Sequence, residues 1–204
     1  MTDYWNHNVH YHPRLLAAVP PGARTALDIG CGDGLLAHRL TRRAGAVTGI
    51  DRSPEMIRLA RERGAGVPGL TFREADFLDP AGSGLPSAGY DFISAVAVLH
   101  HVPFTAALTR LSELLAPGGR LAVLGLGRDR TPGDWLTSGA GAVAHRLHAR
   151  RHGGDGGPAG MPVRDAEMSW SRVRAEASAA LPGCRYRRLV LWRYLLVWER
   201  PAHP

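Results

Sequence analysis

The sequence of 204 residues predicts an α/β fold, in which a single domain holds a doubly wound, mostly parallel sheet with helices on both faces. Three observations support this prediction. Short apolar runs alternate with amphipathic stretches as far as Leu126, a glycine-rich turn follows the first run, and acidic residues come near the ends of three successive runs. Such alternation is typical of parallel strands that are joined by crossover helices.

The first part of the chain contains five expected strands and three expected helices. The strands are the short apolar runs Thr25–Ile29, Ala46–Ile50, Leu70–Glu74, Tyr90–Leu99 and Leu121–Leu126. The helices are the stretches with apolar residues at helical spacing, Leu35–Leu40, Pro54–Arg63 and Pro103–Leu115. For the second helix, Ser53 suits the N-cap, Pro54 suits the first helical position and Gly64 marks the end.

After Gly127 the pattern is less regular. We expect a helix over Trp135–Ala149, a glycine-rich loop over His152–Gly160 and a helix over Val163–Ala180. The last segment, Arg185–Glu199, is rich in β-forming residues, but no Gly, Pro or Asn marks a turn within it. One long strand and a tight hairpin that closes near Leu191–Arg193 therefore both fit.

The net charge is +7, and every cationic side chain is an arginine, which excludes a lysine nucleophile or Schiff base. The arginines are scattered at helical spacings, so we expect solvated helix faces and no nucleic-acid partner. The two cysteines, Cys31 and Cys184, form no CxxC pair, so neither a disulfide framework nor a zinc site is expected. With no signal peptide and no apolar run of membrane-spanning length, we expect a cytoplasmic protein without a membrane partner.

The most specific motif ends the first expected strand and reads Leu27-Asp28-Ile29-Gly30-Cys31-Gly32-Asp33-Gly34. Glycine tolerates positive φ angles and lets the backbone approach a ligand closely. The N-terminus of the helix that follows offers free N–H groups to a carboxylate. A dinucleotide fingerprint, G-x-G-x-x-G, would place its third glycine three residues after the second, whereas Gly34 comes two residues after Gly32.

Two further acidic residues follow the next two strands. Asp51 ends the second strand, where a carboxylate can accept hydrogen bonds from both hydroxyls of a ribose. The alternative is an exposed loop acid or a helix cap. Asp76 follows the third strand, directly before Phe77. An acid in one loop carries little information, but acids near the ends of three successive strands indicate a nucleoside site.

The spacing D-x-G-x-G-x-G from Asp28 to Gly34 resembles the first motif of class I S-adenosylmethionine-dependent methyltransferases. Two later segments also resemble motifs of this family. Tyr90–His101 resembles the strand end that passes the methionine part of the cofactor, and Leu115–Leu121 resembles the helix-to-strand turn. The resemblance runs from Ala26 to Leu126 and implies a Rossmann-like, seven-stranded sheet with S-adenosyl-L-methionine as the cofactor.

The same resemblance implies which residues hold the cofactor. In the family, an acid after the third strand binds the adenine amino group and a neighbouring apolar side chain packs on the ring, as Asp76 and Phe77 would do here. The residues expected at the cofactor are Asp28, Gly30, Cys31, Gly32, Gly34, Asp51, Arg52, Met56, Asp76, Phe77, Ala95 and Val96.

His100 and His101 are the candidate catalytic residues, since they lie where the carboxyl edge of the sheet meets the ligand crevice. Methyl transfer is an in-line displacement at a sulfonium, so the enzyme mainly aligns two reactants. A neutral imidazole can also remove the proton of an oxygen acceptor near neutral pH. The alternative is that this Leu-His-His stretch, which is common in the family, forms part of the wall of the cofactor pocket.

The two ends of the chain are expected to form the acceptor side of a single domain. Residues 1–20 would act as a lid, residues 21–127 as the cofactor-binding core, and residues 128–204 as the acceptor pocket and C-terminal β region. The candidate acceptor-binding residues are Trp5, His7, Tyr11, Trp135 and Arg164. The alternatives are a surface-packed terminus, core tryptophans and a solvated Arg164. No metal is expected, because the spacing of His7, His10 and His12 matches no standard site.

The predicted function is methyl transfer to a small-molecule acceptor, with oxygen slightly ahead of nitrogen or carbon. The chain lacks the Asn/Asp-Pro-Pro-Tyr/Phe motif of enzymes that methylate base amines, and it lacks the Pro-Cys nucleophile of C5-pyrimidine methylation. An RNA methyltransferase and a catalytically silent cofactor-binding protein stay as alternatives. An NAD oxidoreductase is disfavoured by the glycine spacing.

Overall fold

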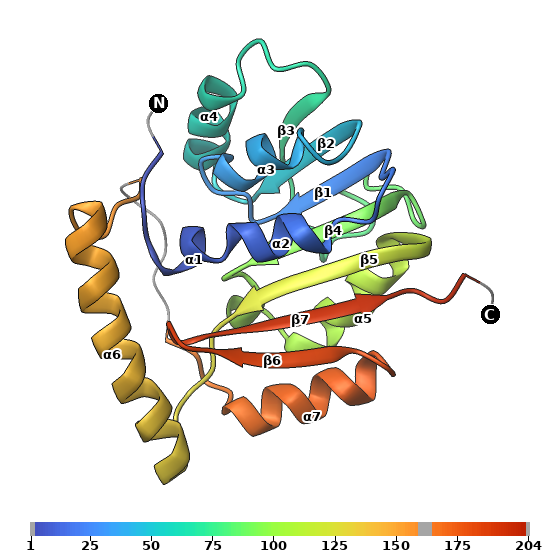
Figure 1. The fold of residues 1–204 in the computed structure, drawn as a ribbon. Helices are drawn as coiled ribbons and strands as arrows, with labels where there is room; N and C mark the ends of the chain where they lie inside the picture. The colour runs from blue at the N-terminus through green and yellow to red at the C-terminus, as the bar shows by residue number, and fades with distance from the viewer. Residues whose placement is uncertain (1–2, 159–164, 203–204) are drawn as a thin grey trace.

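The computed structural model describes residues 3–158 and 165–202 and contains one seven-stranded sheet in the order β3-β2-β1-β4-β5-β7-β6 (Figure 1). Strands β1 to β5 run parallel, whereas β7 pairs antiparallel with β5 and with β6. The predicted mostly parallel α/β sheet is therefore confirmed. The strands are β1 Thr25–Ile29, β2 Ala46–Asp51, β3 Leu70–Glu74, β4 Tyr90–Val96, β5 Leu115–Gly125, β6 Arg185–Leu189 and β7 Arg193–Glu199.

Helices cover both faces of this sheet, as the sequence predicts. Helices α2, α3 and α4 pack on one face, and α5 and α7 pack on the other. Helix α6 stands apart, on the side where β5 ends and next to α1 (Figure 1). The helices are α1 His7–His10, α2 His12–Ala18, α3 Leu35–Leu40, α4 Pro54–Arg63, α5 Phe104–Leu114, α6 Pro132–His152 and α7 Trp170–Ala180, with a 3₁₀ turn, η1, at Leu99–His101.

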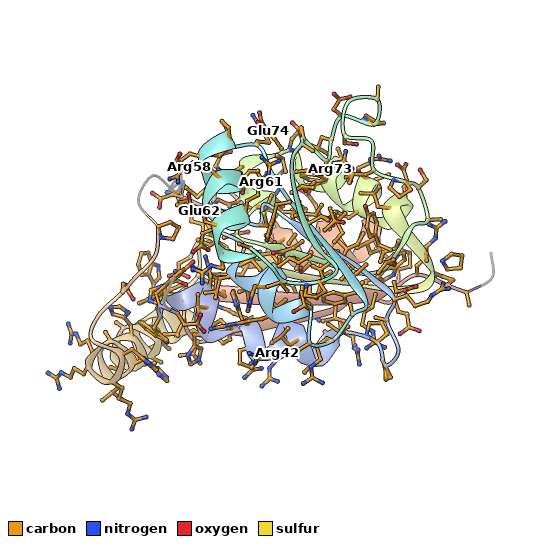
Figure 2. All side chains as sticks on the ribbon, turned by 90° about the horizontal axis from the view of Figure 1, so that it is seen from above. Arg42, Arg58, Arg61, Glu62, Arg73 and Glu74 are labelled. Atoms are coloured by element: carbon orange, nitrogen blue, oxygen red, sulfur yellow. The ribbon has the colours of Figure 1, made fainter. Side chains whose placement is uncertain are left out.

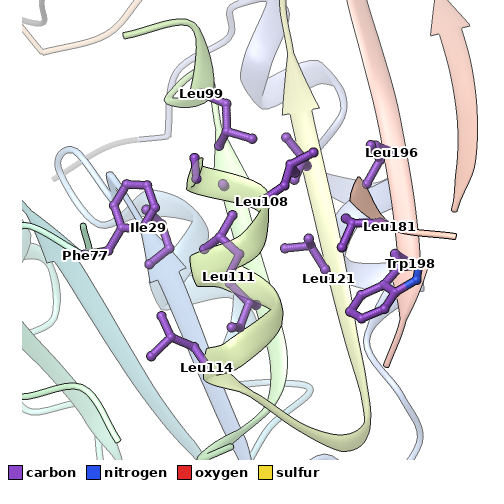
Figure 3. Close-up of a cluster of buried hydrophobic side chains, with 14 of the residues drawn as sticks. Ile29, Phe77, Leu99, Leu108, Leu111, Leu114, Leu121, Leu181, Leu196 and Trp198 are labelled. Carbon is purple, nitrogen blue, oxygen red and sulfur yellow. The ribbon is translucent and has the colours of Figure 1, made fainter. Parts of the chain in front are cut away.

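Successive residues of the central strands alternate between two apolar cores. In β4, Phe92 packs with α2, α3 and α4, whereas Ile93 packs with α5 and α7. Figure 3 shows the second core, where Leu108 and Leu111 of α5 face Leu121 of β5. These leucines are fully buried, and truncating such a side chain to alanine costs about 2–5 kcal/mol. The strand ends that carry the loops of the site are therefore held by close packing.

The ends of two strands differ from the prediction. β4 stops at Val96 and not at Leu99, because Ala97 has a positive φ of 55° and the chain then turns into η1. β5 begins at Leu115 and not at Leu121, so the expected turn between helix and strand is already paired in the sheet. The first difference matters for the site, because it places the two consecutive histidines in a 3₁₀ turn beyond the sheet edge.

The predicted helix over Val163–Ala180 is too long at its start. Val163 lies outside the described residues, residues 165–169 are not helical, and α7 begins at Trp170. The Ser169 side chain caps the helix by accepting a hydrogen bond from the Arg172 N–H at 3.3 Å. Just before the cap, the carbonyl of Met168 accepts a hydrogen bond from Arg128 at 2.8 Å, which keeps this stretch extended.

Helix α6 contains the helix that was predicted over Trp135–Ala149 and extends it at both ends. Thr131 forms a capping box with Asp134: the Thr131 hydroxyl accepts from the Asp134 N–H at 3.2 Å, and the Asp134 carboxylate accepts from the Thr131 N–H at 2.9 Å. Gly153, with φ of 76°, ends the helix.

Strands β6 and β7 form a hairpin, which decides between the two possibilities that the sequence left open. The turn is made by Trp192, which adopts a positive φ of 51° although it is not a glycine, and its N–H donates to the carbonyl of Val190 at 2.9 Å. The N-terminal segment holds this turn in place, because the Tyr11 hydroxyl accepts a hydrogen bond from the Leu191 N–H at 3.0 Å.

His12 is buried near the start of α2, with 4% of its surface exposed and its Nδ1 3.1 Å from an Arg39 nitrogen. Burial, and after it the Arg39 charge, lowers the pKa of His12 from 6.5 to about 3. Because the folded pKa lies below the unfolded one, the unfolded chain takes up a proton first as the pH falls. The His12 contribution to the free energy of unfolding therefore decreases from about pH 6.5 downward.

Replacing His12 with glutamine should remove this pH dependence. Between pH 6.5 and pH 5 the wild type should lose about 2 kcal/mol of unfolding free energy relative to His12→Gln, since one pH unit corresponds to about 1.4 kcal/mol for a group that titrates only when unfolded. Chemical denaturation at the two pH values measures the difference, with His38→Gln on α3 as the matched control. An identical pH dependence in wild type and His12→Gln would contradict the prediction.

Basic and acidic side chains are interleaved on the surface of α4 and β3 (Figure 2). Arg58 pairs with both Glu55 and Glu62, at the helical spacing that the sequence shows. Arg63 departs from the expected solvated face: its side chain is 5% exposed and its Nη2 lies 2.5 Å from a carboxylate oxygen of Asp33. Within residues 3–158 and 165–202, no helix combines the length and the apolar character needed to cross a membrane.

Candidate functional site

A cavity of about 600 Å³ opens at the carboxyl ends of β1, β2 and β4. The strand order reverses between β1 and β4, and ligands of such sheets bind in the crevice at that point. The volume lies within the range of small-molecule pockets. The predicted site residues that line the cavity are Gly30, Gly32, Asp51, Arg52, Met56, Phe77, Val96, His100 and His101.

The glycine turn after β1 forms one wall of the cavity. Within this turn, Gly30 is the position that most clearly excludes a side chain. Gly30 has a positive φ of 63°, and a β-carbon built there would lie 2.3 Å from Cγ2 of Val98. A side chain at this position would therefore strain the backbone and collide with the segment that follows β4. Gly34 lies behind the turn as the N-cap of α3 and does not line the cavity, because it packs against Phe72.

Asp28 lies beneath the glycine turn and is 2% exposed. Ser94 of β4 donates a hydrogen bond to its Oδ1 at 2.7 Å, while burial raises the pKa of Asp28 to about 7. Asp28 and Cys31 line a smaller cavity of about 50 Å³. The two cavities share Asn8, Gly30, Gly32 and Val96. Asp28 and Cys31 are thus placed beside the large cavity and not in its lining.

Asp51, at the end of β2, connects the second strand to the glycine turn. Its Oδ2 accepts a hydrogen bond from the Gly32 N–H at 2.9 Å, and its Oδ1 accepts one from the Ser53 N–H at 2.9 Å. Each carboxylate oxygen can accept a second hydrogen bond, so both oxygens can still bind hydroxyl groups in the cavity. The carboxylate therefore fixes the turn and faces the cavity at the same time.

The wall beside Asp51 is apolar and is formed by Ile50, Met56, Ala75 and Phe77. This surface can pack against the face of a planar ring. Asp76 lies between two of these residues in the chain but not in the cavity lining: its carboxylate accepts from the Leu78 N–H at 2.9 Å.

Arg52 also belongs to this side of the cavity. Its Nε lies 3.7 Å from an Asp76 carboxylate oxygen, so the two side chains form an ion pair at the rim. Ala95, another residue expected at the cofactor, is fully buried among the residues that pack with α5 and does not reach the cavity.

His100 and His101 line the opposite wall, in η1 directly after β4. Their ring centroids are 4.0 Å apart, and the ring planes are inclined by 40°. The left-handed Ala97 makes this placement possible, because it turns the chain out of the sheet before the histidines. Both imidazoles are therefore at the cavity, where either could approach a bound acceptor.

Asn8 and Arg193 line the same cavity, although sequence reasoning did not select them. The Arg193 Nε donates a hydrogen bond to the Asn8 Oδ1 at 2.7 Å, so α1 and the start of β7 meet there. The aromatic N-terminal segment was a usable signal for Asn8. No sequence pattern indicated Arg193, because the orientation of its side chain depends on the β6–β7 hairpin, which the sequence left open.

Four of the residues predicted to bind the acceptor, Trp5, His7, Tyr11 and Trp135, do not belong to the cavity lining. Trp5 is buried and stacks on His148 and His152 of α6, with ring centroids 5.9 and 5.4 Å away. Tyr11 is buried and bonded to the hairpin turn, and Trp135 is 67% exposed on α6. Arg164 lies outside the described residues.

His7, the remaining acceptor candidate, belongs to a group that also contains His145 and Asp155. Its Nε2 lies 2.8 Å from Nδ1 of His145, which is a hydrogen-bond distance. Burial, and after it the Arg193 charge, lowers the pKa of His7 to about 4. Candidate ligand atoms of the three residues lie within 4.8 Å of one another, so the group has the composition of a metal site, outside the lining of the large cavity.

Comparison with known sequences gives one family and several relatives. A family described as "Methyltransferase domain" matches residues 26–119. The "Uncharacterized methyltransferase Rv0089" of Mycobacterium tuberculosis (strain ATCC 25618 / H37Rv) is 38% identical over 215 residues, which cover 99% of this chain and 100% of the relative. A "Ubiquinone biosynthesis O-methyltransferase" of Xanthomonas axonopodis pv. citri (strain 306) is 36% identical over 126 residues, which cover 60% of this chain and 50% of that protein.

Solved structures share the fold at low sequence identity. N-methyltransferase NodS from Bradyrhizobium japonicum WM9 superimposes with a TM-score of 0.61 at 19% identity, covering 95% of this chain and 96% of that one. A second NodS structure, in complex with S-adenosyl-L-homocysteine, gives a TM-score of 0.60 at 19% identity and covers 95% and 87% of the two chains. A SAM-dependent methyltransferase from Aquifex aeolicus superimposes with a TM-score of 0.62 at 18% identity, covering 92% of this chain and 88% of that one.

Proposed function

Because this chain belongs to the class I S-adenosylmethionine-dependent methyltransferases, we propose that it transfers a methyl group to a small-molecule acceptor, with oxygen as the favoured acceptor atom. One observation carries the proposal: the Asp51 carboxylate is bonded to the Gly32 N–H at the edge of a 600 Å³ cavity. This arrangement presents a glycine turn and a strand-end acid to the same ligand.

The residues present fit this cofactor. Gly30 and Gly32 line the cavity without side chains, so a ligand can approach the backbone of the turn closely. We assign the ribose hydroxyls to Asp51 and the adenine ring to the apolar wall that contains Met56 and Phe77. We assign the amino-acid tail to the glycine turn and to the buried Asp28 beneath it, where the smaller cavity opens. These assignments account for both cavities.

The bound cofactor supplies an electrophilic methyl group on a sulfonium. The chain then has to align the acceptor and manage its proton. We assign the second task to His100 or His101, since a neutral imidazole next to an acceptor hydroxyl can remove its proton. The preference for oxygen draws support from the ubiquinone biosynthesis O-methyltransferase relative, which matches 60% of this chain and half of its own length.

We also propose the division of the chain that the sequence predicted, with a core over residues 21–127 and acceptor-side segments at both ends. Two observations support it. Residues 1–20 supply Asn8 to the cavity, and residues 128–204 supply Arg193. The core supplies the glycine turn, Asp51 and both histidines of η1.

The proposal is tested first by binding and then by turnover. Isothermal titration should give saturable binding of S-adenosylhomocysteine and none of NAD. Methyl transfer from labelled S-adenosylmethionine should then be measured with a panel of phenols, carboxylates, amines and a short RNA. Absence of S-adenosylhomocysteine binding to folded protein would refute the proposal. Binding without turnover of any acceptor would favour a silent cofactor-binding protein, and turnover of the RNA alone would favour an RNA methyltransferase.

The role of the histidines is tested with the acceptor that reacts best. The double variant His100→Gln/His101→Gln should lower kcat by about 10²–10⁴-fold, which is the usual contribution of a general base. Its affinity for S-adenosylhomocysteine should stay within about threefold of wild type. A large loss of that affinity with little change in kcat would instead assign these residues to the pocket wall.

A further inference from the structure

Arg193 is a buried cation that faces the large cavity. Its surface is 9% exposed, and it belongs to the cavity lining together with Leu126 and the two histidines of η1. Two neutral oxygens hold its guanidinium: Nε donates to Asn8 Oδ1 at 2.7 Å, and Nη1 donates to the carbonyl of Trp192 at 3.1 Å. These two bonds fix the orientation of the side chain, which reaches the cavity lining from the start of β7.

Other buried arginines differ from Arg193 in having an acidic partner. Arg63, with a side chain 5% exposed, lies 2.5 Å from Asp33, and Arg110 lies 3.2 Å from Glu113. None of the ion pairs among the described residues includes Arg193. Burial accordingly lowers the pKa of Arg193 to about 10. A buried charge without a counter-charge is unfavourable, so its retention indicates that a ligand supplies the anion.

The hairpin turn and the N-terminal segment together position Arg193. Trp192 adopts a left-handed conformation directly before Arg193, and its ring packs against His7, with centroids 5.1 Å apart. The N-terminal segment approaches from the other side and supplies Asn8. Arg193 is therefore held by contacts from both ends of the chain, which is typical of a positioned recognition residue and not of a flexible surface arginine.

The sheet order places Arg193 on the acceptor side of the cavity. Strand β7 lies three positions from β1 in the order β1-β4-β5-β7, which is about 14 Å at the usual spacing of about 4.8 Å. The nucleoside residues Asp51 and Phe77 lie in the opposite direction, after β2 and β3. Going from the nucleoside end toward Arg193, a ligand passes the glycine turn, then the histidines of η1 and then Leu126.

We propose that Arg193 binds a carboxylate of the methyl acceptor, so that the substrates of this enzyme are small carboxylic acids. This inference rests on the proposed function and adds the substrate class to it. A planar guanidinium can form two parallel hydrogen bonds to a carboxylate, and such charge-assisted pairs are stronger than neutral ones. The anion would also neutralise the Arg193 charge inside the cavity. A neutral analogue would leave that charge unpaired, which is why charge should govern selectivity.

The test uses benzoate and its neutral analogue benzamide as probes on protein saturated with S-adenosylhomocysteine. Wild type should bind benzoate at least tenfold more tightly than benzamide, at constant ionic strength. Arg193→Gln should remove this preference, while the matched control Arg187→Gln, an exposed arginine of the same hairpin, should keep it. Arg193→Lys keeps the charge without the planar fork and should retain an intermediate preference.

The second arm distinguishes the acceptor from the cofactor tail as the source of the carboxylate. S-Adenosylhomocysteine has the amino-acid tail, whereas 5′-methylthioadenosine lacks it. Arg193→Gln should leave the dissociation constants of both within about threefold of wild type. A tenfold loss for S-adenosylhomocysteine alone would assign Arg193 to the cofactor and overturn the proposal.

Equal binding of benzoate and benzamide by wild type would also overturn it, and that result needs no variant. The proposed function and the role of Arg193 can be refuted independently. If S-adenosylhomocysteine does not bind, the proposed function itself fails. If it binds but benzoate is not preferred, only the assignment of Arg193 fails.

Discussion

Replacing Asp51 with asparagine should weaken the binding of S-adenosylhomocysteine by about 10²–10⁴-fold. The carboxylate accepts hydrogen bonds from two backbone N–H groups, of Gly32 and Ser53. The asparagine amide has one acceptor oxygen, so its NH₂ group would face one of these donors. The change would therefore disturb the glycine turn as well as remove acceptors for the ribose. Loss of two charge-assisted hydrogen bonds, at about 1.5–3 kcal/mol each, gives the stated range.

Isothermal titration of the folded variant measures this effect. Glu74→Gln is the matched control, because Glu74 is an exposed acid at the end of the neighbouring strand β3 and does not line the cavity (Figure 2). Its affinity should equal that of wild type. If Asp51→Asn bound S-adenosylhomocysteine within threefold of wild type, Asp51 would be a structural brace of the turn and not a ligand-binding residue.

The Asp51 side of the site was predictable because its parts are local. A parallel strand that ends in glycines and another that ends in an acid must bring these residues to one edge of the sheet, whatever the remaining fold. Gly30, Gly32 and Asp51 accordingly share one cavity in the structure, and their binding of the cofactor stays a prediction. It also predicted α4 with its exact bounds, since Ser53, Pro54 and Gly64 are unambiguous end signals.

The side of the cavity that contains Arg193 was not predictable, because it depends on contacts between the two ends of the chain. Arg193 faces the cavity only because β6 and β7 form a hairpin, and that hairpin turns at Trp192, a residue type that rarely adopts positive φ. No rule for turn residues would select it. The aromatic side chains of Trp5 and Tyr11 suit acceptor binding, but in the structure they attach the N-terminal segment to α6 and to the hairpin.

The end of β4 is another feature that the sequence did not predict. The apolar run from Tyr90 to Leu99 has no internal stop signal, so a strand over the whole run was the natural expectation. Ala97 ends it early with a positive φ of 55°, and its N–H donates to the carbonyl of Leu124 at 2.8 Å. A close tertiary contact explains the bend, since Val98 lies against Gly30. The turn after β1 and the turn after β4 are thus shaped by one another.

This mutual fit predicts a large effect for Gly30→Ala. The new β-carbon would lie 2.3 Å from Val98 Cγ2 in a backbone with φ of 63°. The left-handed conformation costs about 1–2 kcal/mol for a non-glycine residue, and overpacking adds about 1–3 kcal/mol. We therefore expect a loss of about 2–5 kcal/mol in unfolding free energy, measured by chemical denaturation. Because the displaced turn carries Gly32, affinity for S-adenosylhomocysteine should fall at least 100-fold.

Two further variants separate the strain from the collision. Gly22→Ala has the same kind of positive φ, 73°, but nothing lies within 4 Å of its β-carbon, so it should lose only the 1–2 kcal/mol of backbone strain and keep full affinity. Val98→Ala should remove most of the collision when combined with Gly30→Ala, so the double variant should regain stability and part of the affinity. If the double variant were as impaired as Gly30→Ala alone, contact with Val98 would not be what makes glycine necessary here. The requirement would then arise from the backbone conformation or from the ligand itself.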